Sequence, residues 1–266
     1  MKTRLGRLET LLLAYAQMRK LRTLRLGELA EPLQLSPVQE RELLSRLSRG
    51  GLIARVRPGL YLLPPRLPFG GAWTPCAGEA LNALMEDTNG RYQICGANTF
   101  NRYGFDDQIP NRVYAYNNRI SGRRTVGVVE MTLIKVADKR LGDTETVTLH
   151  DGTSVVYASR VRSLVDAVYD WSRFDGIPRG FDWIRQELTA KRVTAAELVK
   201  CTLRFGDTGT IRRIGALLEQ QGVDAALLKR LERVLKPTSS MIPWVPWRPK
   251  KGSSNHRWGV VLNEPI

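Results

Sequence analysis

The sequence has few of the residues on which metal-binding and disulfide-stabilised proteins depend. Its three cysteines, Cys76, Cys95 and Cys201, are too scattered for a disulfide framework or a C-x-x-C metal site. Histidine occurs only twice, at His150 and His256. Zinc coordination, catalytic triads and general-base catalysis therefore lack their usual side chains. We expect a protein that is not an enzyme, with no catalytic residues, no metal site and no cofactor.

Long apolar runs are also missing. No stretch approaches the roughly twenty residues that a membrane-spanning helix needs. The N-terminal segment LETLLLAYAQ is too interrupted to serve as the apolar part of a signal peptide. The phosphate-binding patterns G-x-x-x-x-G-K-[ST] and G-x-G-x-x-G and the nucleophile pattern G-x-S-x-G do not occur. We therefore expect a cytoplasmic protein without a membrane partner, and nucleotide hydrolysis and acyl transfer have no support.

Acidic residues are scarce relative to basic ones. Lys and Arg total 41 against 26 Asp and Glu, which gives a formal net charge of +15. Residues 1–66 alone hold 13 basic and 5 acidic side chains, whereas the remaining residues hold 28 and 21. Such a charge says little about fold, but it favours a polyanionic partner such as DNA or RNA. The N-terminal quarter is where that partner is expected to bind.

Residues 1–66 have the order of elements that is typical of a winged helix-turn-helix domain. Apolar side chains at helical spacing predict a helix over 4–20, and an extended link leads to a short helical stretch over 27–32. A third helix is predicted from Ser36 to Arg49, followed by a hairpin over 52–63. This order predicts a helix that enters a DNA major groove and a hairpin that flanks it.

The third helix and the hairpin carry specific start and turn signals. Ser36 is suited to cap the helix, with Pro at the first helical position and Gln39 able to complete a capping box. Gly50-Gly51 ends the helix. In the hairpin, Arg57-Pro58-Gly59-Leu60 fits a type II turn, because Pro fixes the first central dihedral and Gly accepts the second.

A helical wheel separates the third helix into an apolar and a basic face. Leu43, Leu44 and Leu47 form the core face, and the opposite face is polar and mostly basic. Side chains on that face could reach base edges, while the hairpin arginines could reach phosphates or a minor groove. A solvated surface or a protein-binding adaptor are the alternatives. The predicted DNA-binding residues are Gln39, Arg41, Ser45, Arg46, Arg49, Arg55 and Arg57.

The rest of the chain predicts a larger mixed domain, so the expected fold class is α+β. Prolines and glycines over 64–71 predict a linker between a domain at 1–66 and a second domain at 72–266. The second domain is expected to contain strands over about 91–158, including one long strand over 125–136. The expected order then continues with helices over about 159–235 and an extended tail over 237–266 that is rich in Trp and Pro.

Several residues of the second domain allow both a structural and a functional interpretation. Arg162 and Asp166 are four residues apart on a predicted helix, and we favour an ion pair that ties the helix to the sheet over a contact surface. The tail tryptophans are interpreted as packing anchors rather than as platforms for bases. The cations of the helical region are expected to face solvent, although a second polyanion surface stays open. These cations are Lys200, Arg204, Arg212, Arg213, Lys229, Arg230 and Arg233.

The carboxylates allow one alternative function, a nuclease-like or RNA-modifying enzyme that uses the winged helix for docking. Metal-dependent nucleases place carboxylates and a lysine around a cation, which Asp106-Asp107, Glu130 and Lys135 could supply. Glu130 and Lys135 are five residues apart, however, and would point to opposite sides of a strand. A polar turn at Asp106-Asp107 is the simpler interpretation.

Four segments resemble the AbiEi-type antitoxins of the abortive-infection AbiE family. They are GGLIARVRPGLYLLPP, YQICGANTFNRYGFDDQIPNRVYAYN, SRVRSLVDAVYDW and RWGVVLN. Together these segments are spread over most of the chain, but each is short and mostly structural. The segment IPWVPW is not part of the family pattern, so the role of the tail is not given by the resemblance.

The resemblance implies a specific function. AbiEi-type proteins are antitoxins of type IV toxin–antitoxin systems and are encoded beside a nucleotidyltransferase-like toxin, AbiEii. Such pairs act in abortive infection against phage. The winged helix of the antitoxin binds inverted repeats in its own promoter and represses the operon, and the C-terminal domain carries the antitoxin activity. A stable complex between toxin and antitoxin is not required.

Overall fold

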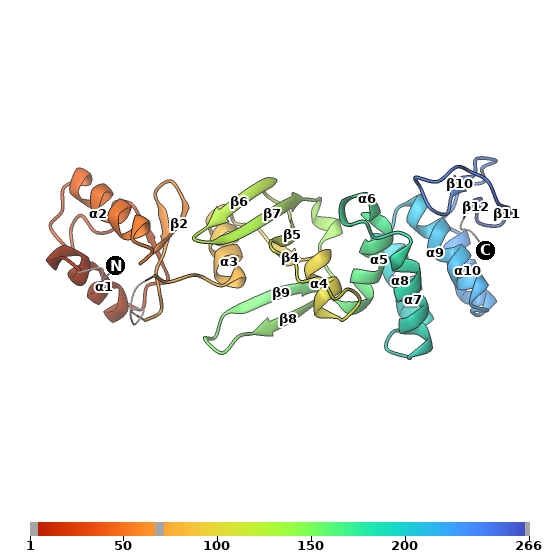
Figure 1. Cartoon of the computed structure of the whole chain (residues 1–266), viewed down its shortest axis with the longest axis horizontal. Helices are drawn as coiled ribbons and strands as arrows, with labels where there is room; N and C mark the ends of the chain where they lie inside the picture. The colour runs from red at the N-terminus through yellow and green to blue at the C-terminus, as the bar shows by residue number, and fades with distance from the viewer. Residues whose placement is uncertain (1–4, 67–71, 264–266) are drawn as a thin grey trace. The chain divides into compact units, whose positions relative to one another are not determined.

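The computed structural model describes residues 5–66 and 72–263 and shows a mixed α+β protein (Figure 1). The predicted linker over 64–71 lies largely outside the described residues. None of the described helices combines the length and the apolar character that crossing a bilayer requires. The chain forms two compact units, the first made of Met1–Gln93, Asn111–Leu141 and Thr146–Val156, and the second of Ile94–Pro110, Gly142–Glu145 and Tyr157–Ile266.

The N-terminal part of the first unit contains two helices and a small sheet. Its elements are α1 (Arg7–Met18), β1 (Thr23–Arg25), α2 (Pro37–Arg49), β2 (Ala54–Arg57) and β3 (Leu60–Leu62). The three strands form an antiparallel sheet in the order β1-β3-β2. Gly59 between β2 and β3 has φ +77°, the left-handed conformation that the predicted turn requires of a glycine. These elements confirm the predicted helices over 4–20 and 36–49 and the predicted hairpin over 52–63.

Helix α2 begins where its capping signal predicts. The Ser36 hydroxyl accepts a hydrogen bond from the backbone N–H of Gln39 at 3.3 Å, and the Gln39 side chain accepts one from the backbone N–H of Ser36 at 2.9 Å. This reciprocal pair satisfies two N–H groups that the first turn would otherwise leave open. The helix ends at Gly50, and Gly51 continues in a left-handed conformation with φ +70°.

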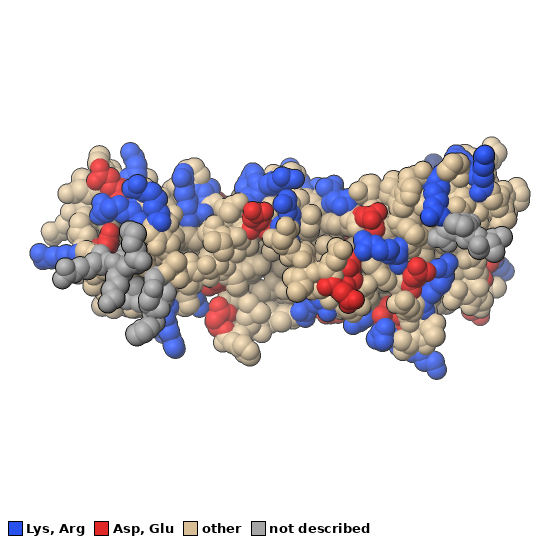
Figure 2. Space-filling model, viewed as in Figure 1, with Lys and Arg blue, Asp and Glu red and all other residues tan. Residues whose placement is uncertain are grey.

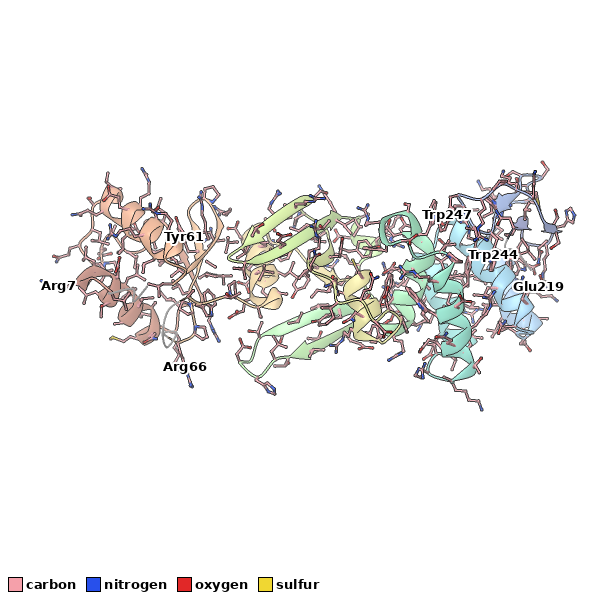
Figure 3. All side chains as sticks on the ribbon, in the orientation of Figure 1. Arg7, Tyr61, Arg66, Glu219, Trp244 and Trp247 are labelled. Carbon is pink, nitrogen blue, oxygen red and sulfur yellow. The ribbon has the colours of Figure 1, made fainter. Side chains whose placement is uncertain are left out.

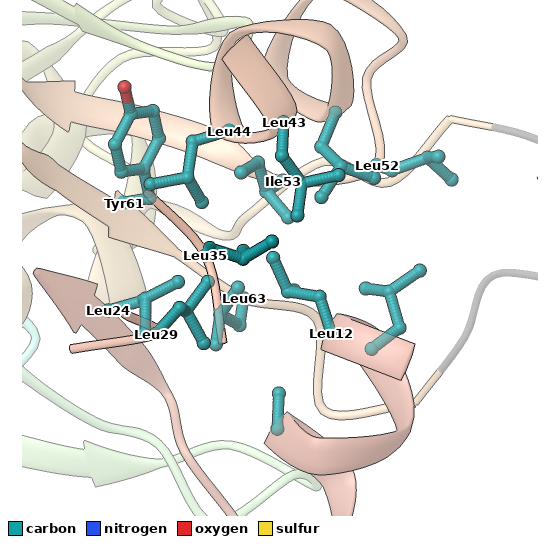
Figure 4. Packing of buried hydrophobic residues seen from close by; sticks show 13 residues of the cluster. Leu12, Leu24, Leu29, Leu35, Leu43, Leu44, Leu52, Ile53, Tyr61 and Leu63 are labelled. Atoms are coloured by element: carbon teal, nitrogen blue, oxygen red, sulfur yellow. The ribbon is translucent and has the colours of Figure 1, made fainter. Parts of the chain in front are cut away.

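Leucine side chains hold this part together. Leu12 of α1 and Leu43 and Leu44 of α2 meet Leu24 of β1 and Tyr61 of β3 in one core (Figure 4). All five are at least nine-tenths buried. The predicted apolar face of α2 is thus the face that packs, and its basic face is left outside.

The predicted short helix over 27–32 is wrong. Gly27–Gln34 forms successive turns, with Gly27 at φ +102°, a conformation outside the helical region. The turns are held from α2, because the carboxylate of Glu40 accepts hydrogen bonds from the backbone N–H of Gly27 at 2.9 Å and from that of Leu29 at 3.1 Å. Glu40 is only 1% exposed. A long-range carboxylate therefore binds the first N–H groups of this segment and ties the turns to α2.

The first unit continues into a larger sheet. Here α3 (Ala77–Thr88) is followed by β5 (Val113–Asn117), β6 (Gly122–Val126), β7 (Val129–Lys135) and a 3-10 turn at Asp138–Arg140. The strand order is β6-β7-β5-β4-β9-β8, with β6 at one edge. The strand predicted over 125–136 is confirmed as β7, but its beginning is wrong, since Gly127 at φ +61° reverses the chain and separates β6 from β7. Strands β4 (Tyr92–Ile94), β8 (Thr144–Thr148) and β9 (Ser154–Ala158) contribute residues to both units.

The second unit is mainly helical, as predicted for 159–235. Its helices are α4 (Ala97–Arg102), α5 (Arg160–Tyr169), α6 (Trp171–Phe174), α7 (Arg179–Thr189), α8 (Ala195–Phe205), α9 (Thr208–Gln220) and α10 (Ala225–Glu232). Within it the predicted ion pair is present: Arg162 Nε lies 2.9 Å from Asp166 Oδ1, and both side chains are fully buried. Arg162 also donates a hydrogen bond to the carbonyl of Gly142. This pair is structural, because it has no access to solvent.

The C-terminal segment packs as an extended strap against the helices of the second unit. It forms a three-stranded sheet of β10 (Ile242–Pro243), β11 (Ser253–Asn255) and β12 (Val260–Leu262). Trp244 and Trp258 are each 1% exposed, whereas Trp247 is 51% exposed. Figure 3 labels Trp244 and Trp247 along this segment. Two tryptophans are thus the packing anchors that the sequence predicts.

Two arginines of α9 overturn the prediction that the cations of this region face solvent. Arg212 and Arg213 are 5% and 8% exposed. Neither forms an ion pair within 4 Å with another described residue. Each donates to backbone carbonyls of the strap instead, Arg212 to that of Trp258 and Arg213 to that of Pro243. Burial lowers the pKa of both guanidinium groups. The strap supplies acceptors that the sequence pattern of α9 could not reveal.

The buried carboxylate of Glu40 gives a first testable prediction. Replacing Glu40 by Ala leaves two backbone N–H groups without an acceptor, so we expect the free energy of unfolding to fall by about 1–3 kcal/mol. Glu42→Ala is the matched control, because Glu42 is exposed on the same helix and is expected to change stability by less than about 0.5 kcal/mol. Urea denaturation measures both, and equal values for the two variants would contradict the role assigned to Glu40.

Candidate nucleic-acid interface

The outer face of α2 carries the predicted DNA-binding arginines. Arg41, Arg46 and Arg49 are exposed, and Ser45 is half-buried between them. Lys and Arg atoms gather over α2 and the following hairpin on the face shown in Figure 2. Val38 lies at the start of the same helix and is 60% exposed. It is an apolar side chain beside arginines, a combination suited to contact with a thymine methyl group, and the sequence analysis did not select it.

The α2 side chains differ in how free they are to bind a partner. Arg41 makes no hydrogen bond or ion pair with the described residues. Arg46 lies 3.4 Å from Glu9 of α1 and is 47% exposed, so this pair is weak and easily exchanged for a phosphate. Among the residues that the structure describes, Arg49 makes only a long contact of 3.5 Å with the carbonyl of Ser45. Gln39 is engaged in the helix cap, so a base contact would compete with the cap.

The two hairpin arginines have different surroundings. Arg55 and Arg57 are both exposed on β2, separated by the buried Val56. Arg55 has no acidic partner among the described residues. The guanidinium of Arg57, in contrast, forms two hydrogen bonds with Asp87 of α3, at 2.5 Å and 2.6 Å, and a third with the carbonyl of Pro58. Arg55 is thus available to an external anion, whereas Arg57 is occupied within the protein.

Asp87 joins the N-terminal sheet to α3. Its carboxylate also lies 2.9 Å from Arg25 of β1, so one acid holds an arginine from each of two strands. The side chain of Asp87 is 7% exposed, whereas those of Arg25 and Arg57 are about half exposed. The hydrogen bond from Arg57 is the main cause that lowers the pKa of Asp87, and it outweighs the opposing effect of burial. Nothing in the local sequence around Asp87 signals this contact, because its partners lie 30 and more residues away.

Two carboxylates of the alternative enzyme hypothesis, Asp106 and Glu130, lie in different units and pair with different arginines. Asp106 belongs to the second unit and pairs with Arg179 at 2.5 Å. Glu130 and Lys135 belong to the first unit, where Glu130 lies 3.5 Å from Arg112. Over residues 5–66 and 72–263, no group of three or more His, Cys, Asp or Glu side chains could hold a metal ion. The geometry therefore offers no observation in favour of metal-dependent cleavage.

Comparisons with known proteins bear on the fold alone. No family model matches the chain, and no curated protein matches it. Among solved structures, the chain is similar to the crystal structure of the RV2827C protein from Mycobacterium tuberculosis, with a TM-score of 0.58 and 14% sequence identity. The likeness covers 97% of this chain and 92% of that one. The whole α+β arrangement thus recurs in a distant sequence.

The Asp87 contact predicts a pH dependence of stability. Because folding lowers the pKa of Asp87 below its ordinary value of 3.8, its contribution is present above about pH 4 and is lost as the pH falls through the folded-state pKa. We expect Asp87→Asn to lower the free energy of unfolding at pH 7 by about 1–3 kcal/mol. The variant should also lose less stability than the wild type between pH 5 and pH 3.

Urea titrations at several pH values measure this difference. Asp107→Asn is the control, since Asp107 is an exposed carboxylate without an ion pair among the described residues. Parallel pH profiles for the wild type and Asp87→Asn would show that the contact contributes nothing to folding.

Proposed function

We propose that this protein is a sequence-specific DNA-binding transcriptional repressor whose N-terminal part is a winged helix-turn-helix domain. The order α1, β1, turns, α2, β2, β3 supports this interpretation, with the turns over 27–34 in the place of the short second helix. The antiparallel β1-β3-β2 sheet gives a hairpin directly after α2. In this proposal α2 lies in the major groove and the hairpin lies beside it.

The observation that carries the proposal is a basic helix face with little acidic compensation. Arg41 and Arg49 have no carboxylate partner among the described residues, and the pair of Arg46 with Glu9 is partly solvated. Arginines in this state can bind phosphates or the edges of guanine without first breaking a strong internal contact. Arg55 of the hairpin adds another free guanidinium. Of the predicted DNA-binding residues, we assign direct contacts to Arg41, Arg46, Arg49 and Arg55, and to Ser45 of α2. Arg57 and Gln39 are held by contacts within the protein and support the hairpin and the helix that present them.

The antitoxin role rests on the resemblance to AbiEi-type proteins. We infer that the protein represses its own operon in the cytoplasm by binding inverted repeats, and that it counteracts a nucleotidyltransferase-like AbiEii toxin without needing a stable complex. A nucleotidyltransferase-like reading frame beside its gene is the expected finding. Co-expression should then restore growth that the neighbouring gene alone arrests. Growth arrest that persists in the presence of this protein would overturn the antitoxin assignment but leave the repressor assignment intact.

A base-reading arginine should change specificity. We expect Arg41→Ala to weaken binding to the upstream DNA of its own gene by about 1–3 kcal/mol and to loosen the preference at one base pair. Arg230→Ala is the control, because Arg230 is an exposed arginine of α10 in the second unit. Gel shifts with the upstream duplex and with a random duplex give the ratio of affinities. An unchanged ratio for Arg41→Ala would show that Arg41 does not read a base.

A phosphate-binding arginine should act on all sequences equally. We expect Arg55→Ala to lower the affinity for the upstream duplex and for the random duplex by similar factors. It should also reduce the slope of log K against log salt by about 1. Titrations between 50 and 200 mM salt measure the slope, with Arg230→Ala again as the control. A loss confined to the upstream duplex would assign Arg55 to base reading instead.

A further inference from the structure

Strand β6 presents two more arginines beside the hairpin of the first unit. Arg123 and Arg124 lie on the edge strand of the six-stranded sheet, and the first four residues of β6 are all exposed. The turn that ends β6 lies against β2: a Cβ atom on Gly127 would approach the Cβ atom of Ala54 to 3.4 Å. At about 3.3 Å per residue along a strand, both arginines lie roughly 10–14 Å from that turn. Arg55, next to Ala54, is thus the neighbour of a second basic segment.

This second segment is not neutralised from within. Arg123 has no ion pair or hydrogen bond from its side chain to the described residues, and Arg124 donates only to the backbone carbonyl of Arg123 at 2.8 Å. The nearest acid by strand register is Glu130, which lies opposite Thr125 and is bound to Arg112. A phosphate can therefore bind here without displacing an internal carboxylate.

The Asp87 contact fixes the two basic segments relative to each other. Arg57 and Arg25 attach the N-terminal sheet to α3, and the turn at Gly127 packs between Ala54 and Pro75. The hairpin and β6 are thus parts of one compact unit. Lys and Arg atoms continue from α2 past the hairpin to β6 on the face shown in Figure 2. These groups of Lys and Arg atoms, with neutral and some acidic atoms between them, lie along one face of the unit.

Charged side chains on an edge strand also prevent sheets from joining edge to edge, which is the simpler role for Arg123 and Arg124. That role explains the charges but not their uniform sign beside the hairpin. Arg123 shares a face of the sheet with Thr132, and Arg124 shares the opposite face with Met131. Long side chains that leave an edge on both faces can grip a polyanion backbone that runs along it.

We propose that β6 is a second site of contact with the DNA backbone, in which Arg123 and Arg124 bind phosphates that flank the segment read by α2. The partner is double-stranded DNA longer than a winged helix alone would cover. This inference rests on the proposed DNA binding by α2 and extends it to a part of the chain that follows the N-terminal domain.

The test compares the double variant R123A/R124A with the wild type on two duplexes from the upstream DNA, one of about 14 and one of about 30 base pairs. On the long duplex we expect affinity to fall about 10- to 30-fold near 150 mM salt and the salt slope to fall by about 2. The affinity for the short duplex should change little, and so should the ratio of the affinities for upstream and random DNA. Protection of the deoxyriboses beside the flanking phosphates from hydroxyl radicals should disappear.

The control is the double variant K229A/R230A, which removes the same charge from exposed positions of α10. Thermal unfolding verifies that both variants remain folded. If R123A/R124A and the control bind the long duplex equally well, the β6 contact is refuted while the repressor proposal stands. If the wild type binds the upstream duplex no better than random DNA and Arg41→Ala changes neither affinity, the proposal that α2 reads bases is refuted. A loss of affinity for the long duplex in R123A/R124A but not in K229A/R230A would then still assign β6 to backbone binding.

Discussion

The ion pairs of Asp87 are the constraint on which the arrangement of the first unit depends. One nearly buried carboxylate binds an arginine from β1 and an arginine from β2, so the small N-terminal sheet is held to α3 at two points. Losing one arginine would leave the carboxylate paired with the other, whereas losing the carboxylate would break both contacts at once. The contact thus joins β1 and β2 to α3 through a single side chain. The basic side chains of α2 and the hairpin and those of β6 are thereby carried by one unit.

Much of the fold could be predicted because its signals are local. The capping box at Ser36 and Gln39, the turn at Pro58-Gly59 and the helical spacing of the leucines each act over a few residues, and each is confirmed. The errors arise where a distant group decides the conformation. In the turns over 27–34, Gly27 has φ +102° and the distant Glu40 binds the N–H groups of Gly27 and Leu29. Arg212 is buried where the C-terminal strap brings carbonyls to it.

The candidate interface shows the same division between local and long-range information. The wheel for α2 separates the buried leucines from the exposed arginines, and the structure places them accordingly. A helical wheel cannot reveal that Gln39 takes part in the helix cap or that Arg57 binds Asp87, since a residue type and its spacing do not say where a partner will lie. The uniform charge of Arg123-Arg124 was present in the sequence, but its position beside the hairpin follows only from the fold.

The partners of each arginine indicate which surface can bind an anion more clearly than net charge does. Several arginines of the second unit are held by carboxylates, as in the pairs Arg160–Glu187, Arg179–Asp106 and Arg257–Glu232. A paired arginine gains less from a phosphate than an unpaired one does, because it must give up one anion to bind another. Arg41, Arg55 and Arg123 of the first unit have no carboxylate partner among the described residues, and neither has the exposed Arg230 of the second unit. What distinguishes the first unit is therefore that such arginines lie on α2, the hairpin and β6, which belong to one compact unit.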